Sequence, residues 1–448
     1  MIGRFPWDPF PPDQPAPSGD DPLLAAVYRG AVEGADAYRA VRSAVRREGG
    51  VLRVGNRFVP DGRYREVGFV ALGRAASSMA LAVLHVFGDR LTQGFVAGPE
   101  EPPEAVPFRS EKVEDGWGGD EAAPRVLDAA REISVGLRES DLFLLLVSPG
   151  AIRSLVLPPT GLDRAAFAAL LRQLYDGGAT GADVGNVARV LGTGGVGGRL
   201  LPPSMTADAQ CLIVDRGDGP AAVGGGPTFP LSNDERLRAR ATLETAGLLR
   251  TLPATATGPL SSGASERAVG GRRPVVVAAP ADGIRSAGDV AFDKGWSARV
   301  GLLGMNDRAP VAVPKFLGAF ERVIATERLG EGSRSKGIAV FATTTLDLPE
   351  GVPERTACEE FLAAARTALL RREMSIGLFR TAGATGPAPD FAGGVVGAAV
   401  DPSSTPPRTA SIRPIRVPAG ITDVGLLVTA LLPASPGGRP TPSHGGAR

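Results

Sequence analysis

The chain has 448 residues, of which 43% are hydrophobic and 22% charged, and its formal net charge is +1. This length indicates roughly two to four domains with a large core. The near-neutral charge argues against nucleic acid or an anionic membrane as the main partner. Two cysteines supply neither a zinc site nor a disulfide framework. Because no apolar run is long enough to span a bilayer and the start lacks a signal-peptide core, we expect a cytoplasmic protein.

Histidine chemistry is also disfavoured by the composition. His85 and His444 are the only histidines. His85 lies in an apolar helical pattern and His444 in a segment rich in proline and glycine, so neither is well placed as a general base. Mechanisms built on Ser-His-Asp, Cys-His or His-metal groups therefore rank low.

Strand-like apolar runs alternate with amphipathic helical stretches along most of the chain. This alternation is typical of an α/β fold with mainly parallel sheets flanked by helices. The first expected element is a helix at about 21–47, which should pack on a sheet. Strands are then expected at 67–73, 141–148 and 210–215, and helices at 75–87, 163–175, 181–191 and about 233–249.

A second α/β series follows residues 251–273, whose Gly, Ser, Thr and Ala without periodicity predict a linker or mobile loop. Its strands are expected at 274–279, 298–304, 337–343, 375–383 and 423–432, with a helix near 355–372. We therefore predict two domains with a cleft between them. The predicted division is a disordered segment at 1–20, an N-terminal domain at 21–250, the linker, a C-terminal domain at 274–433 and a disordered tail at 434–448.

The stretch LGTGGVGGRLL at 191–201 contains the spacing G-x-G-x-x-G from Gly192 to Gly197. A dinucleotide loop needs a strand that delivers such glycines to the N-terminus of a helix. Here a predicted helix with a capping-box pattern runs into the glycines instead. Gly198 and Arg199 stand where a P-loop needs Lys and Ser/Thr. The simplest interpretation is a glycine-rich turn that ends the helix.

Several motifs follow one another in an order known from one enzyme family. They are VALGRAASSMA (70–80), LLVSPGAIRSLVLP (145–158), DGGATGADVGNVARVLGTGGVGGRLL (176–201), DGPAAVGGGPTFP (218–230), APDFAGGVV (388–396) and PAGITDVGLLV (418–428). In this order they resemble the glycerate 2-kinases of the MOFRL type, over about residues 21–432. The resemblance implies a two-domain α/β protein with a MOFRL-like C-terminal domain. Enzymes of this family transfer the γ-phosphoryl group of ATP to the 2-hydroxyl of glycerate.

The resemblance also implies site residues and ligands. An active member would use ATP and Mg²⁺ and bind a small anionic metabolite such as glycerate or phosphoglycerate. The catalytic positions would be Arg74, Arg189, Arg355 and Asp218, with Asp215 and Asp218 as metal ligands. The ligand-binding positions would be Ser148, Gly150, Gly197, Gly198, Arg199 and Gly226.

Many of the positions that serve chemistry depart from the family pattern. Arg74 replaces a lysine, which keeps the charge but not the compact geometry. Where the family has Gly-Gly-Gly-Ser, Pro149 removes an N–H donor, and Ala151 and Ile152 disfavour a positive φ. In the C-terminal domain the family's carboxylates are lost at 342–345 and 384–386, and Arg355 matches a family arginine only after a one-residue shift. Since one preorganised donor is worth about 10²–10³ in rate, we expect impaired catalysis.

Three hypotheses remain open. The favoured one is a non-catalytic relative that binds a small anion or a partner chain. The second is an active ATP-dependent kinase of glycerate or a related hydroxy acid, and the third is another reaction in the same cleft. Homodimer, hetero-oligomer and pairing with an intact paralogue are not distinguished. In each case we predict that the loops at 147–153 and 192–199 and residues 216–227 lie together at the cleft.

Overall fold

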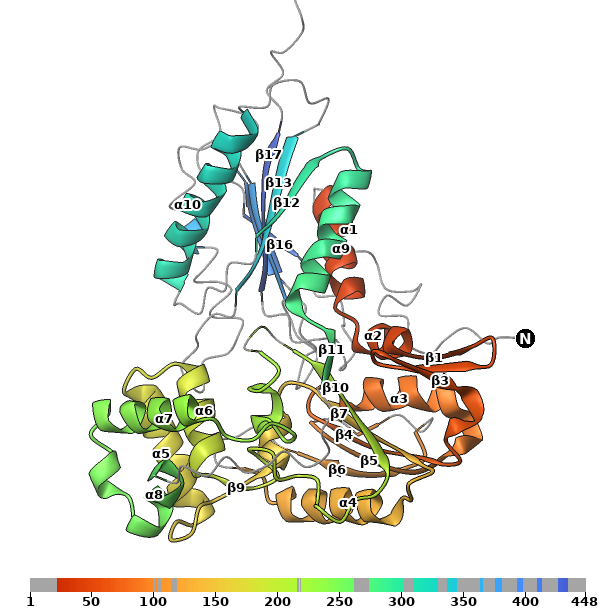
Figure 1. The fold of residues 1–448 in the computed structure, drawn as a ribbon. Coiled ribbons are helices and arrows are strands. Elements are labelled where there is room, and N and C mark those ends of the chain that lie inside the picture. The colour runs from red at the N-terminus through yellow and green to blue at the C-terminus, as the bar shows by residue number, and fades with distance from the viewer. Residues whose placement is uncertain are drawn as a thin grey trace, which may run out of the picture.

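The computed structural model describes residues 22–99, 101–102, 106–113, 119–215, 217, 219–261, 274–301, 309–328, 337–344, 363–365, 375–380, 393–397, 409–412 and 426–433. These residues form two α/β domains, each built on a sheet with helices beside it (Figure 1). The predicted disordered segments at 1–20 and 434–448 lie outside the described residues. Of the helix predicted near 355–372, only residues 363–365 are described, and they are helical.

The N-terminal domain contains a six-stranded sheet whose strands all run parallel. The chain starts in the middle of this sheet, adds two strands on one side and then returns to the other side. The order of the sheet therefore reverses between β4 and β7, and ligands of such sheets bind beyond the carboxyl ends of the strands at this point. In spatial order the strands are β11 (Val275–Ala278), β10 (Asp208–Val214), β7 (Leu142–Val147), β4 (Val67–Leu72), β5 (Leu91–Gly98) and β6 (Arg109–Lys112).

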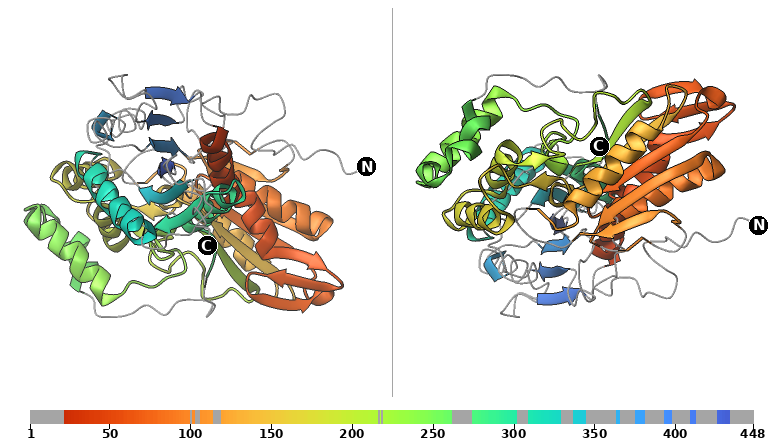
Figure 2. Two further views of the ribbon diagram at one scale, coloured as in Figure 1. Left: turned by 90° about the horizontal axis from the view of Figure 1, so that it is seen from above. Right: turned by 90° about the horizontal axis from the view of Figure 1, so that it is seen from below.

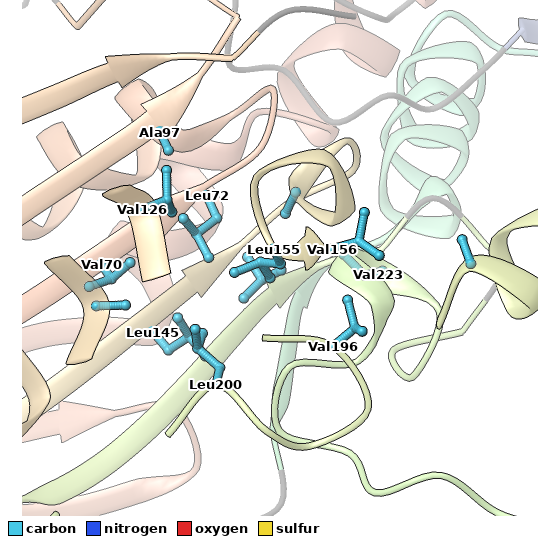
Figure 3. Close-up of a cluster of buried hydrophobic side chains, with 14 of the residues drawn as sticks. Val70, Leu72, Ala97, Val126, Leu145, Leu155, Val156, Val196, Leu200 and Val223 are labelled. Carbon is cyan, nitrogen blue, oxygen red and sulfur yellow. The ribbon is translucent and has the colours of Figure 1, made fainter. Parts of the chain in front are cut away.

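Both faces of this sheet are covered, so its strands are apolar on both sides. Phe69 and Ala71 of β4 pack with helices α2 (Ala37–Ala44) and α3 (Ala76–Phe87) on one face. Val70 and Leu72 of the same strand pack toward α4 (Ala123–Gly136) on the other face (Figure 3). The hydrophobic core on the α4 face continues into a cluster of four helices. These are α5 (Arg164–Asp176), α6 (Gly181–Leu191), α7 (Asn233–Thr245) and α8 (Ala254–Ser261).

A small antiparallel sheet, not expected from the sequence, lies at the other end of this domain from α5–α8 (Figure 2). It consists of β1 (Val45–Glu48), β2 (Val51–Val54) and β3 (Arg57–Pro60). Leu52 and Val54 bury one of its faces in the core beside α3.

The single helix predicted at about 21–47 is wrong. The chain instead forms α1 (Pro22–Gly34) and then α2, which is capped by the side chain of Asp36. The carboxylate accepts hydrogen bonds from the backbone N–H groups of Tyr38 and Arg39. An aspartate that satisfies the first free donors of a helix starts a new helix rather than continuing the old one.

The second domain has a six-stranded sheet that is mixed rather than mainly parallel. Only β12 and β13 pair in parallel, and the four other pairs are antiparallel. Apolar periodicity does not encode strand direction, so the sequence pattern could not show that most strand pairs of this second sheet are antiparallel. Helices α1 and α9 (Pro280–Asp293) cover one face and α10 (Ala309–Arg328) lies on the other (Figure 1). The strands in spatial order are β12 (Ser297–Gly301), β13 (Gly337–Thr344), β17 (Leu426–Pro433), β14 (Ser375–Arg380), β15 (Gly393–Gly397) and β16 (Thr409–Ile412).

The structure assigns several elements to a different domain from the one predicted. Strand β11, expected to open the C-terminal domain, pairs with β10 of the first sheet. Helix α8 occupies part of the predicted linker and packs on α6 and α7, whereas residues 262–273 lie outside the described part. Helix α1 packs on α9 and on Ala339 of the second sheet. The first domain therefore runs from α2 to β11, and the second consists of α1 and the elements from α9 onward.

Close packing of α1 on α9 generates a stability prediction. A Cβ atom at Gly34 would lie 2.6 Å from Cβ of Ser286 and 2.7 Å from the carbonyl oxygen of Asp282. Gly34→Ala should therefore destabilise the protein by about 1–3 kcal/mol, measured by thermal unfolding. Gly185 in α6 has no neighbour within 4 Å of an added Cβ. Gly185→Ala should stabilise by up to about 1 kcal/mol, and equal effects of the two changes would contradict the packing.

Candidate functional site

The loops after β4 and β7, on either side of the point where the sheet order reverses, are joined by hydrogen bonds. The backbone N–H and the hydroxyl of Ser148 both donate to the carbonyl of Leu72, each at 2.9 Å. The same hydroxyl accepts from the N–H of Ala75 at 3.0 Å. The N–H of Arg74 donates to the carbonyl of Pro149 at 2.9 Å. Ser148 therefore holds the two loops together, and its hydroxyl is already engaged by the protein.

A solvent-open hollow of about 230 Å³ lies beside these loops, at the carboxyl ends of β4 and β5. Two arginines, Arg74 and Arg153, contribute to its lining, and Gly150 forms part of its wall next to Arg74. The φ of Gly150 is 88°, and an added Cβ would meet Cγ of Arg74 at 3.4 Å. The hollow is lined by Gly73, Arg74, Ala97, Gly98, Pro99, Val113, Gly150, Arg153 and Ser154.

The three predicted cleft segments do meet, in their described residues. A Cβ at Gly224 would contact Val147 and Ala151, and one at Gly225 would contact Val196 and Ile152. Loop 147–153, the glycine turn at 192–199 and the chain before Pro227 are therefore packed against one another. Figure 3 shows the apolar side of this contact around Leu155, Val156, Val196 and Val223.

The glycine turn uses its N–H groups within the protein. The N–H groups of Gly197 and Gly198 donate to the carbonyls of Gly225 and Gly226, each at 2.9 Å. Arg199 closes the turn from the other side, because its guanidinium donates to the carbonyls of Val196 and Gly192 at 2.9 and 2.7 Å. These N–H and guanidinium groups donate hydrogen bonds to the neighbouring loop and to the turn itself. They therefore stabilise the fold rather than bind an anion.

Arg189 is almost completely buried, with 3% of its surface exposed. Its guanidinium pairs with Glu235 of α7 and donates to the carbonyl of Phe229 at 2.9 Å. It also packs against Gly226, where an added Cβ would lie 2.8 Å from the guanidinium carbon. Burial lowers the pKa of Arg189, while the charge of Glu235 acts in the opposite direction. The side chain joins α6, α7 and the loop before α7.

The predicted metal site is described only in part. A carboxylate oxygen of Asp215 accepts from the N–H of Gly217 at 3.0 Å, which forms a local turn. Asp218 and Arg355 lie outside the described residues. In the part of the chain that the structure describes, no three His, Cys, Asp or Glu side chains gather as metal ligands would.

Sequence reasoning missed Arg153, which the structure places with Arg74 at the hollow. Arg153 belongs to a short 3-10 helix, Ala151–Ser154, directly after the loop that holds Ser148. The family pattern around SPGAIRSLVLP treats this position as variable and so gives no reason to select it. The sequence feature that could have indicated Arg153 is a positively charged residue in the loop after a central strand of the sheet.

Comparisons with known proteins place the chain in a family. Residues 23–261 match the family described as "Domain of unknown function (DUF4147)", which is more than half of the chain. The chain therefore belongs to the DUF4147 family. It is also 28% identical over 220 residues to a glycerate kinase of Danio rerio, and this alignment spans 45% of the chain and 43% of that relative.

Two solved structures share the fold. One is a protein from Pyrococcus horikoshii, with a TM-score of 0.65 and 21% identity over 92% of this chain and 98% of that chain. The other is a glycerate kinase from Thermotoga maritima, with a TM-score of 0.66 and 20% identity over the same shares. The α/β fold expected from the sequence and its resemblance to the glycerate kinases are confirmed. None of the described helices has the length and hydropathy needed to cross a membrane.

The network around Arg189 predicts a large stability effect from one substitution. Arg189→Met removes the cation that faces Glu235 and leaves the carbonyl of Phe229 without this donor. We expect a loss of about 3 kcal/mol in the free energy of unfolding, measured with denaturant. As a control, Arg240→Met breaks an exposed pair with Glu244 in α7 and should cost less than about 0.5 kcal/mol. An Arg189→Met protein as stable as the control would show that the buried pair is not structural.

Proposed function

We propose that the chain is a glycerate-kinase-like protein with impaired catalysis, and that the hollow beside Arg74 binds a small anionic metabolite such as glycerate or phosphoglycerate. The observation that carries this proposal is that Arg74 and Arg153 both line the hollow. Guanidinium groups match carboxylate and phosphate oxygens in a bidentate way, so two of them favour a small anion over a neutral ligand.

The composition of the lining supports a small organic acid as the ligand. The hollow's space of about 230 Å³ includes the part open to solvent. The apolar side chains of Ala97, Pro99 and Val113 complete the lining and would face the carbon atoms of such an acid.

The engagement of other polar groups supports impaired catalysis. Phosphoryl transfer depends on donors and cations aimed at the charge that develops on the transferred group. Arg189 and the N–H groups of Gly197 and Gly198 are bonded to the protein instead. The described residues also hold no group of three His, Cys, Asp or Glu side chains that could bind a metal ion. A cytoplasmic location stays a prediction.

An active ATP-dependent kinase is the alternative, and it has a direct test. Calorimetry with ATP and Mg²⁺ on the purified chain should show weak binding, because Pro149 removes a donor from the loop. A micromolar dissociation constant, equivalent to about 8 kcal/mol, together with ATP-dependent phosphorylation of glycerate, would contradict the proposal of impaired catalysis.

Anion binding itself is tested by thermal shift. Glycerate, phosphoglycerate and sulfate are titrated separately, and at least one phosphate- or sulfate-bearing ligand should raise the melting temperature by a few degrees. This follows because a ligand at a hundred times its Kd adds about 2.7 kcal/mol to the native state. Arg74→Ala should abolish the shift, whereas Arg240→Ala, at an exposed site on α7, should leave it unchanged. Identical shifts in both variants would place the anion elsewhere.

A further inference from the structure

The outer face of the β1–β3 sheet is exposed although the sheet is firmly attached. Its inner face carries the buried residues Val45, Leu52 and Val54. Because side chains alternate along a strand, every second residue of each strand lies on the opposite, outer face. The register aligns Arg46 with Arg53 and Arg53 with Phe58, and aligns Glu48 with Val51 and Val51 with Pro60. We call these six residues the outer face: Arg46, Glu48, Val51, Arg53, Phe58 and Pro60.

Ion pairs hold this sheet rigidly on the domain. Arg57 of β3 pairs with Asp208 of β10 at 2.8 Å, and the hydroxyl of Tyr64 donates to the same carboxylate at 2.6 Å. Asp61 binds both Arg47 and Arg90, at 2.6 and 3.0 Å, and these arginines hold the pKa of Asp61 below its ordinary value. The outer face is therefore a fixed surface rather than a loose hairpin.

The outer face combines exposed apolar groups with positive charge. Phe58 is 68% exposed and Val51 42%. The guanidinium of Arg53 lies 5.7 Å from the centre of the Phe58 ring. The outer face carries two arginines, Arg46 and Arg53, and one acidic residue, Glu48. Aromatic and arginine side chains that are exposed together on a rigid surface are characteristic of interaction sites.

The chain itself contains a segment of complementary composition. Residues 1–21, outside the described residues, contain four aspartates and one arginine, six prolines, and the aromatic residues Phe5, Trp7 and Phe10. Proline-rich segments with aromatic side chains dock on aromatic surfaces at a low entropic cost. The aspartates are complementary to the outer face, on which Arg46 and Arg53 outnumber Glu48. We propose that residues 1–21 dock on the outer face of β1–β3 within the same molecule.

The connection between the two is short enough for intramolecular docking. Residue 22 begins α1, which has 13 residues, and α2 has 8 residues and leads directly into β1. At 1.5 Å per helical residue, and with the two linking residues extended, the start of α1 lies within about 40 Å of β1. A stretch of 21 residues spans up to about 70 Å when extended. Residues 1–21 therefore reach the outer face without any rearrangement of the described fold.

Fluorine NMR of the full chain labelled with 5-fluorotryptophan tests this docking residue by residue. The chain has three tryptophans, and Trp7→Phe assigns the Trp7 resonance. That resonance should be shifted and broadened relative to a synthetic peptide of residues 1–21. Phe58→Ser and Arg53→Glu should each return it to the peptide position. Phe292→Ser, which changes another exposed phenylalanine (72% exposed, on α9), should leave it unchanged.

Further readouts separate intramolecular docking from unfolding and from contact between two copies of the chain. The resonance of Trp296 should stay in place in Phe58→Ser and Arg53→Glu, which establishes that the fold is retained in these two variants. Salt at about 1 M should weaken the docking, because the paired charges are exposed and the Debye length falls to about 3 Å. A Trp7 resonance at the peptide position in the unmodified chain, or one insensitive to Phe58→Ser and Arg53→Glu, overturns the proposal. A shift that disappears on dilution assigns the contact to a second copy and also overturns it.

Discussion

The carboxyl edge of the first sheet depends on the hydrogen bonds of Ser148. Its hydroxyl and N–H bind the carbonyl of Leu72, and the hydroxyl receives the N–H of Ala75, so one residue after β7 fixes the end of β4 and the start of α3. Pro149 extends this link by accepting the N–H of Arg74. The position of Arg74 at the hollow thus follows from backbone geometry, and the hollow can be no wider than these bonded loops allow.

Hydrogen bonds within the protein also fix the other loops at the carboxyl edge of this sheet. A buried polar group must find a partner, and here the partners are other loops of the protein. The glycine turn binds residues 225 and 226, Arg199 binds back onto the turn, and Arg189 pairs with Glu235. Each bond stabilises the loops against one another and at the same time removes a donor from contact with a ligand. A donor at this edge of the sheet can therefore either hold two loops together or bind a ligand, but not both.

The sequence was sufficient for the elements whose character is local. The strands expected at 67–73 and 141–148 form β4 and β7, and the expected helix at 181–191 forms α6. Partners far apart in sequence could not be read from it. Nothing in the pattern around Arg189 indicates that Glu235 would meet it, and nothing in the apolar run of β11 indicates which sheet it would join. The family motifs indicated that these three loops would lie together, because they preserve order and spacing, but not which bonds the loops would form.

The place of α1 has a consequence for synthesis of the chain. This helix is made first, yet its packing partner α9 begins at Pro280, roughly 250 residues later. At about 5–20 residues per second, α1 waits about 12–50 s for the surface that buries Val27, Tyr28 and Ala31. The intervening domain can fold as soon as β11 has left the ribosome. The nascent protein therefore carries an unburied apolar helix beside a finished domain, and this interval is when the chain is most exposed to chaperones and proteases.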